Sequence, residues 1–147
     1  MKIGVVVPTF DQYANGEAFR RIVEVLESLG FDSAWFGDHV VFPRDYPDYM
    51  SPNWMDAVTC AIMGLGMTSR LTFGTDVLVA AYRNPILLAK MAATAAQLAG
   101  GRLLIGIGSG WLSGEFEALG GPSFSARTPY WKNILRSFGH CLRPTGQ

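Results

Sequence analysis

The chain has 147 residues, of which 49% are apolar, and its 12 basic and 12 acidic side chains balance to a net charge of zero. This composition is typical of a globular domain and argues against a disordered chain or a nucleic-acid-binding protein. No uncharged apolar stretch reaches the roughly 20 residues of a membrane span, so we expect no membrane partner. Cys60 and Cys141 have neither metal-ligand nor redox spacing, so we expect no metal and a location in the reducing cytoplasm.

The first 30 residues predict a strand followed by a helix. Residues 3–7 are a short apolar run ending at Pro8, as in a strand buried on both faces. Asn15 is a suitable N-cap for a helix that presents one apolar stripe and reaches Leu29. Gly30 can follow this helix, because glycine readily adopts the left-handed conformation of the C′ position.

The same alternation continues along the chain. Residues 54–67 are apolar enough for a buried helix, and Asn84-Pro85 opens another that extends to Gly100-Gly101. A fourth helix is expected within residues 111–119. Further strands are predicted at residues 34–36, 71–78 and 102–107.

Strict alternation of buried strands and helices predicts an α/β fold with a parallel sheet. Two architectures fit this pattern, a doubly wound open sheet and part of a (β/α)8 TIM barrel. A complete barrel needs about 250 residues, so four βα units in this length correspond to half a barrel. The pattern alone does not separate the two architectures.

Polar residues follow the apolar strands at the ends where ligands bind in both architectures. Asp38-His39 follows the second strand, and an acid beside an imidazole can bind a polar heterocycle or transfer protons. The alternative is a turn-capping Asp beside an exposed His. Asp76 interrupts the third strand, either as the wall of a cofactor pocket or as a bulge with its carboxylate bonded to backbone amides.

Two further clusters lie at later strand ends. Arg83 offers a planar fork for an anion, although Asn84 is equally suited to cap the next helix. The glycine-rich segment 106–110 joins a strand to a helix and can bind an anion through backbone N–H groups. It is not a dinucleotide-binding fingerprint, because Trp111 stands where the last glycine would be.

Five short motifs follow one another within residues 1–120. They are FGTDVL at 73–78, YRNP at 82–85, GGR at 100–102, GIGSGW at 106–111 and EFEALG at 115–120. Taken together in this order, they resemble the luciferase-like monooxygenase family, and most closely its F420-dependent oxidoreductases. The resemblance implies a (β/α)8 barrel that binds FMN or the deazaflavin F420 at its carboxyl-terminal mouth.

The resemblance also implies roles for individual residues. His39 would transfer a proton near the cofactor ring, and a non-prolyl cis peptide between Asp76 and Val77 would support that ring. The helices at 54–67 and 87–98 would form a homodimer interface. The residues implied in cofactor binding are Asp38, His39, Thr75, Asp76, Val77, Gly106, Gly108, Ser109 and Gly110.

The resemblance ends near Gly120, which divides the chain into a barrel half at 1–120 and a divergent tail at 121–147. The tail has four basic residues and no acidic one, and a truncated or frame-shifted gene product would explain it. The leading hypothesis is F420-dependent hydride transfer to or from a small organic substrate. The alternatives are an FMN-dependent monooxygenase that uses molecular oxygen, and a non-catalytic remnant that only self-associates.

Overall fold

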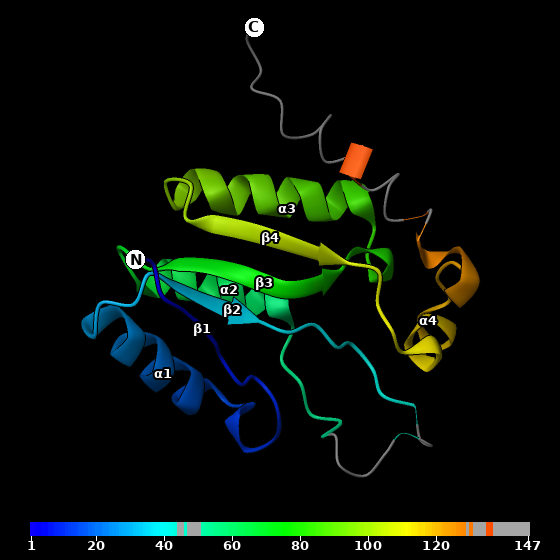
Figure 1. The fold of residues 1–147 in the computed structure, drawn as a ribbon, viewed down its shortest axis with the longest axis horizontal. Coiled ribbons are helices and arrows are strands. Elements are labelled where there is room, and N and C mark those ends of the chain that lie inside the picture. The colour runs from blue at the N-terminus through cyan, green and yellow to red at the C-terminus, as the bar shows by residue number, and fades with distance from the viewer. Residues whose placement is uncertain (44–45, 47–50, 129, 131–134, 137–147) are drawn as a thin grey trace, which may run out of the picture.

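A computed structural model of the chain describes residues 1–43, 46, 51–128, 130 and 135–136. Strands and helices alternate along it, as the sequence predicts (Figure 1). The strands are β1 Gly4–Val6, β2 Ser33–Phe36, β3 Thr72–Val79 and β4 Leu103–Gly108. The α-helices are α1 Gly16–Ser28, α2 Ala57–Met67, α3 Pro85–Leu98 and α4 Ser113–Leu119. Short 3-10 helices are η1 Asp11–Tyr13, η2 Ala80–Tyr82 and η3 Phe124–Ala126.

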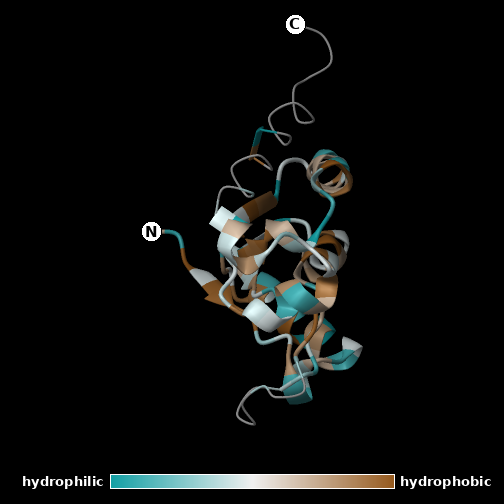
Figure 2. Ribbon diagram, turned by 90° about the vertical axis from the view of Figure 1, so that its right-hand side faces the viewer, coloured by the Kyte–Doolittle hydropathy of each residue, from teal (hydrophilic) through white to brown (hydrophobic). Residues whose placement is uncertain are grey.

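The strand order decides between the two architectures that the sequence leaves open. The four strands form one sheet in the order β1-β2-β3-β4, and every neighbouring pair is parallel. A doubly wound dinucleotide-binding sheet reverses its strand order and carries helices on both faces. Here the order never reverses and the helices lie along one side of the sheet (Figures 1 and 2), so the fold is part of a (β/α)8 barrel.

The main core fills the space between the sheet and its helix layer. From the sheet, Ala34, Phe36 and Phe73 are fully buried against α1 and α2. Further along, Leu78 packs with residues of α3 in a second cluster. Alternate strand residues therefore point towards the helices, as the pleat of a strand requires.

The other face of the sheet is only partly covered, which corrects the expectation of strands buried on both faces. The Trp35 side chain lies beside Gly4 and Gly74, where any Cβ would collide with its ring. Val6 and Leu104 also belong to this face, and they are 60% and 45% exposed. The helices cover one face only, and within the described residues Trp35 supplies much of the cover on the other.

Helix starts follow the capping signals in the sequence. The side chain of Asn15 accepts the Ala18 N–H at the start of α1, and Asn84 accepts two N–H groups at the start of α3. Gly30, with φ of 83°, follows α1 in the left-handed conformation. The predicted cap of the first helix, its terminating glycine and the Asn84-Pro85 start are therefore confirmed.

Two predicted helix starts are too early. The second helix begins at Ala57 with Asp56 as its cap, whereas Trp54 forms a β-bridge with Phe10 and stacks on that ring at 4.5 Å between centroids. The fourth begins at Ser113 rather than at Trp111. In both cases aromatic residues before the helix contact other side chains instead of extending the helix.

Cys60 is buried and free, whereas Cys141 and most of the tail lie outside the described residues. Within the described ranges, no helix combines the length and hydropathy needed to cross a bilayer. The first part of the tail packs on α4, because Phe124 of η3 contacts Phe116 at 5.5 Å between ring centroids.

Candidate active site

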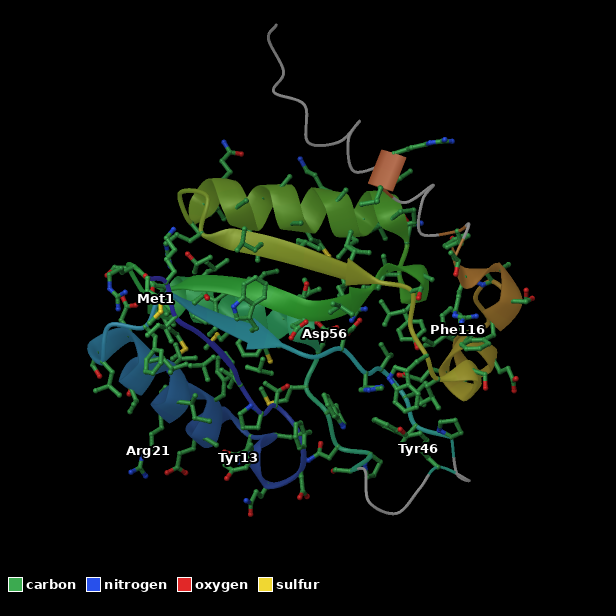
Figure 3. All side chains as sticks on the ribbon, viewed as in Figure 1. Met1, Tyr13, Arg21, Tyr46, Asp56 and Phe116 are labelled. Atoms are coloured by element: carbon green, nitrogen blue, oxygen red, sulfur yellow. The ribbon has the colours of Figure 1, made fainter. Side chains whose placement is uncertain are left out.

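A cavity of about 420 Å³ lies at the carboxyl ends of β2, β3 and β4. Asp38, Asp76 and Ser109 all border it, which confirms the prediction that they meet at one end of the sheet. Figure 3 shows α4, with Phe116 labelled, beyond these strand ends. The lining residues are Gly37, Asp38, His39, Trp54, Asp76, Val77, Val79, Tyr82, Ser109, Gly110, Trp111 and Glu115.

Three of the residues expected to bind cofactor lie next to the cavity without lining it. Thr75 is 1% exposed, and its hydroxyl donates to the carbonyl of Gly106 at 3.0 Å across the β3–β4 pair. Gly108 sits against Val77, whose side chain would collide with any Cβ at that position. These three residues therefore lie behind the cavity surface. The surface itself is formed by residues that follow them in the sequence, such as Asp76 and Ser109.

His39 is held by a buried carboxylate of α4, 76 positions later in the chain. Its Nδ1 lies 2.9 Å from Oε2 of Glu115, and the Glu115 side chain is fully buried. The structure records this single hydrogen bond to the ring among the described residues. Nε2 is therefore the ring nitrogen left for a ligand.

Glu115 has four polar neighbours. Its Oε1 accepts the N–H groups of Val40 and Val41 at 2.8 and 3.2 Å, and its Oε2 accepts the hydroxyl of Tyr82 at 3.0 Å. Burial opposes ionisation of Glu115, but the hydrogen bonds from His39 and the two amides outweigh it and hold the pKa of this carboxyl below its ordinary value. Burial, reinforced by the charge of Glu115, raises the pKa of Tyr82, so its hydroxyl stays protonated and can donate.

Aromatic side chains surround the imidazole of His39. Ring centroids of Phe42 and Trp54 lie 4.8 Å from it, and that of Trp111 lies 5.9 Å away with its ring at 87° to the imidazole. This arrangement leaves the imidazole side chain 10% exposed. Packed rings fix the plane of the imidazole and keep bulk water away from it.

Asp38 and Arg83 form a buried ion pair beside the cavity. Two guanidinium nitrogens of Arg83 each lie 2.7 Å from a different oxygen of Asp38, and the Val79 N–H donates to the same carboxylate at 2.9 Å. Arg83 also contacts Asp56, which lies near the end of β2 (Figure 3), at 2.5 Å. The fork that the sequence offers to an anion is therefore occupied by two carboxylates of the chain itself.

The β3–β4 pairing changes register where β3 meets the cavity. The ladder is interrupted between Thr75 and Leu78, and the Asp76–Val77 peptide is cis, as the resemblance implies. The Val77 side chain is 41% exposed and stands at the cavity wall. Gly110, with φ of 75°, turns the chain from β4 towards α4 and also lines the cavity.

Comparison with known proteins agrees with this geometry. The sequence profile of a family described as "Luciferase-like monooxygenase" matches residues 1–143. The chain belongs to this family. The match continues past Gly120, where the quoted motifs end.

Members of the family that resemble the chain use either type of cofactor. An F420-dependent glucose-6-phosphate dehydrogenase of Amycolatopsis mediterranei (strain U-32) is 35% identical over 125 residues, which cover 78% of this chain and 35% of that protein. An FMNH(2)-dependent dimethylsulfone monooxygenase of Pseudomonas putida is 31% identical over 121 residues, covering 81% of this chain and 32% of that protein. The chain thus spans about a third of the length of these curated relatives.

A solved structure shows the same fold. The monooxygenase RslO1 of Streptomyces bottropensis superposes with a TM-score of 0.77 at 23% identity, covering 94% of this chain and 42% of that one. At this level of identity, the similarity establishes the barrel fold and nothing about activity.

The sequence interpretation does not identify Glu115 or Tyr82 as site residues. Glu115 appears there only as part of a motif, and Tyr82 only as the neighbour of Arg83. No local signal marks Glu115 as buried; the structure shows that it and the apolar Phe116 that follows are both buried.

Proposed function

We propose that the chain provides the first half of the cofactor site of a luciferase-like oxidoreductase that uses F420 and a small organic substrate. The observation that carries this proposal is the cavity at the strand ends, which is lined together by His39, the Asp76–Val77 peptide and the glycine turn at Gly110. Its volume of about 420 Å³ falls in the range of ligand sites, about 300–1,000 Å³.

The residues present fit a flat heterocycle. Part of the cavity wall consists of backbone, because Gly108 and Gly110 carry no side chains. A Cβ at Gly108 would collide with Val77, and a Cβ at Gly110 would collide with Val79. The exposed Val77 side chain offers an apolar support for a ring face. Ser109 and Asp76 add polar groups at the margin of the cavity. When bound, a flavin or deazaflavin would supply two-electron and hydride chemistry.

The side chains of the chain itself would manage the proton. His39 would hold or accept a proton at Nε2 on the cavity side, and its aromatic neighbours would exclude water from that atom. The ion pair of Asp38 with Arg83 would keep the loop that carries His39 in place. Asp38 would thus act through His39 rather than as a direct contact of the cofactor.

The second candidate is a monooxygenase that uses reduced FMN and molecular oxygen. The dimethylsulfone monooxygenase of Pseudomonas putida is nearly as similar to the chain as the F420-dependent relative is. We propose F420 as the cofactor before FMN, because the F420-dependent relative has the higher identity to the chain over a similar length.

Amide NMR of the purified chain with millimolar F420 or FMN tests the proposal, because it detects weak binding. We expect shifts at Val77, Ser109 and Gly110 that are larger with F420 than with FMN. Gly100 and Gly101, which precede β4 at its opposite end, serve as internal controls and should not move.

Larger shifts with FMN would favour the monooxygenase candidate. Absence of shifts with both cofactors at millimolar concentration would contradict the proposed site and favour a non-catalytic chain that only self-associates.

A further inference from the structure

We propose that Glu115 is a positioning residue that fixes neutral His39 as its Nδ1–H tautomer and so presents Nε2 to the cavity as a proton acceptor. This inference rests on the proposed function for its role in a reaction. The tautomer itself is a property of the chain and can be measured without any cofactor.

The hydrogen-bond pattern around Glu115 dictates where the proton of His39 resides. Both oxygens of Glu115 are occupied as acceptors, Oε1 by two backbone N–H groups and Oε2 by the Tyr82 hydroxyl. An ionised carboxylate has no proton to donate. The 2.9 Å contact of Oε2 with Nδ1 therefore requires the proton to be on Nδ1.

The same pattern separates this role from a purely structural one. Oε1 holds the backbone at Val40 and Val41, whereas Oε2 faces His39 and Tyr82. A change that keeps the acceptor at Oε1 but reverses the polarity at Oε2 would preserve the loop and alter only the imidazole.

Glu115→Gln makes this change. If its carbonyl oxygen keeps the two backbone N–H groups, its NH₂ group must face Nδ1 and the Tyr82 oxygen, both of which can accept. Nδ1 then loses its proton, and neutral His39 becomes the Nε2–H tautomer. The variant would thus turn an acceptor facing the cavity into a donor.

The experiment is ¹⁵N NMR of the chain labelled at histidine, recorded at a pH where the imidazole is neutral. The sequence contains two histidines, and His140→Gln removes the second signal. In the otherwise unaltered chain we expect the one-bond N–H coupling at Nδ1 of His39. In Glu115→Gln we expect it at Nε2.

Tyr82→Phe is the matched control, because it removes another partner of Oε2 and leaves the contact with His39 in place. It should retain the Nδ1–H tautomer. An Nε2–H majority in the unaltered chain would overturn the proposal, as would an Nδ1–H majority in folded Glu115→Gln. If Glu115→Gln fails to fold, the unaltered chain and Tyr82→Phe decide, since an Nε2–H majority in either contradicts the proposal.

The two proposals fail in different ways. An Nδ1–H imidazole in a chain that binds neither F420 nor FMN would leave the role of Glu115 intact and remove the proposed cofactor site. Cofactor-induced shifts in a chain with an Nε2–H imidazole would do the reverse.

Discussion

The charged residues at the cavity are held by charge-assisted hydrogen bonds. The Asp38 side chain is fully buried, and three donors, two from Arg83 and one from Val79, satisfy its two oxygens. Burying a carboxylate is unfavourable unless such partners accompany it. The site therefore depends on both members of the pair.

Asp38→Asn should destabilise the fold by about 3 kcal/mol, because it removes the negative charge that faces the buried Arg83 guanidinium and loses the bidentate contact. Urea unfolding at neutral pH measures the change. Asp32→Asn is the control, since Asp32 accepts the Ile3 N–H at an exposed position and an amide can replace it there. Equal losses in the two variants would show that the buried pair contributes nothing specific.

Glu27 is a second carboxylate whose hydrogen bonds contribute to stability, and its contribution depends on pH in the acidic range. Its carboxylate accepts backbone N–H groups of Ser69, Arg70 and Leu71. Partial burial opposes its ionisation, but these bonds outweigh that effect and lower the pKa of Glu27. A depressed pKa in the folded state contributes stability above the unfolded pKa of roughly 4.3. That contribution is lost as the pH falls through the folded value.

We therefore expect the free energy of unfolding to fall as the pH drops from 5 towards about 3, and to fall less in Glu27→Gln. Urea titrations at several pH values check this. The exposed Glu24, on the same helix, provides the control, and Glu24→Gln should follow the unaltered chain. A pH dependence that is identical in Glu27→Gln would contradict the assignment.

Distant partners such as these explain what the sequence interpretation missed. His39 and Glu115 are 76 positions apart, and no local pattern connects them until the strands are paired. The sequence offers the Arg83 fork to an anion, because no local pattern reveals its two carboxylate partners, which precede it by 45 and 27 positions. Strand ends, by contrast, were predictable, because each strand is a local apolar run.

At the scale of elements, α2 approaches β3 closely enough to exclude a side chain. Gly64 is buried in α2 against the Phe73 ring, which any Cβ at this position would meet. The helix start is predicted too early at Trp54, because the apolar Trp54 and Met55 extend the apolar run past Asp56, which caps the helix. Composition predicts that a helix exists more reliably than where it begins.

Gly64→Ala should destabilise the fold by about 1–3 kcal/mol, since the added methyl group forces the Phe73 ring or the helix to move. Gly66→Ala is the matched control in the same helix. No atom lies within 4 Å of a Cβ built at Gly66, so this change should stabilise the helix by up to about 1 kcal/mol. Thermal unfolding of both variants measures the difference. Similar effects at the two positions would contradict the close approach.

At the scale of the whole molecule, two of the exposed apolar surfaces among the described residues are suited to association. The strands β1 and β4 are the edges of the sheet, and Val6 and Leu104 are exposed on its uncovered face. On the helix side, Leu87 and Met91 of α3 are 64% and 49% exposed. Open edges and apolar patches favour association with other chains, and the resemblance predicted a homodimer through the second of these surfaces.

The purified 147-residue chain should therefore self-associate. Leu104→Lys should weaken association through the sheet edge, and Met91→Lys should weaken association through the helices. Sedimentation velocity over a range of concentrations measures both. Val25→Lys is the control, because Val25 is as exposed as Leu104 but lies on α1. A monomer at all concentrations would contradict this prediction.

Every recorded hydrogen bond to the side chains of Asp38, His39 and Glu115 in the described structure joins residues between 38 and 115. A ribosome that has released residue 115 from its exit tunnel has thus already supplied every one of these partners. Synthesis proceeds at about 5–20 residues per second, which is slow compared with the formation of helices and hairpins. The orientation of His39 can therefore be set on the nascent chain once α4 has emerged, before the residues after 119 follow.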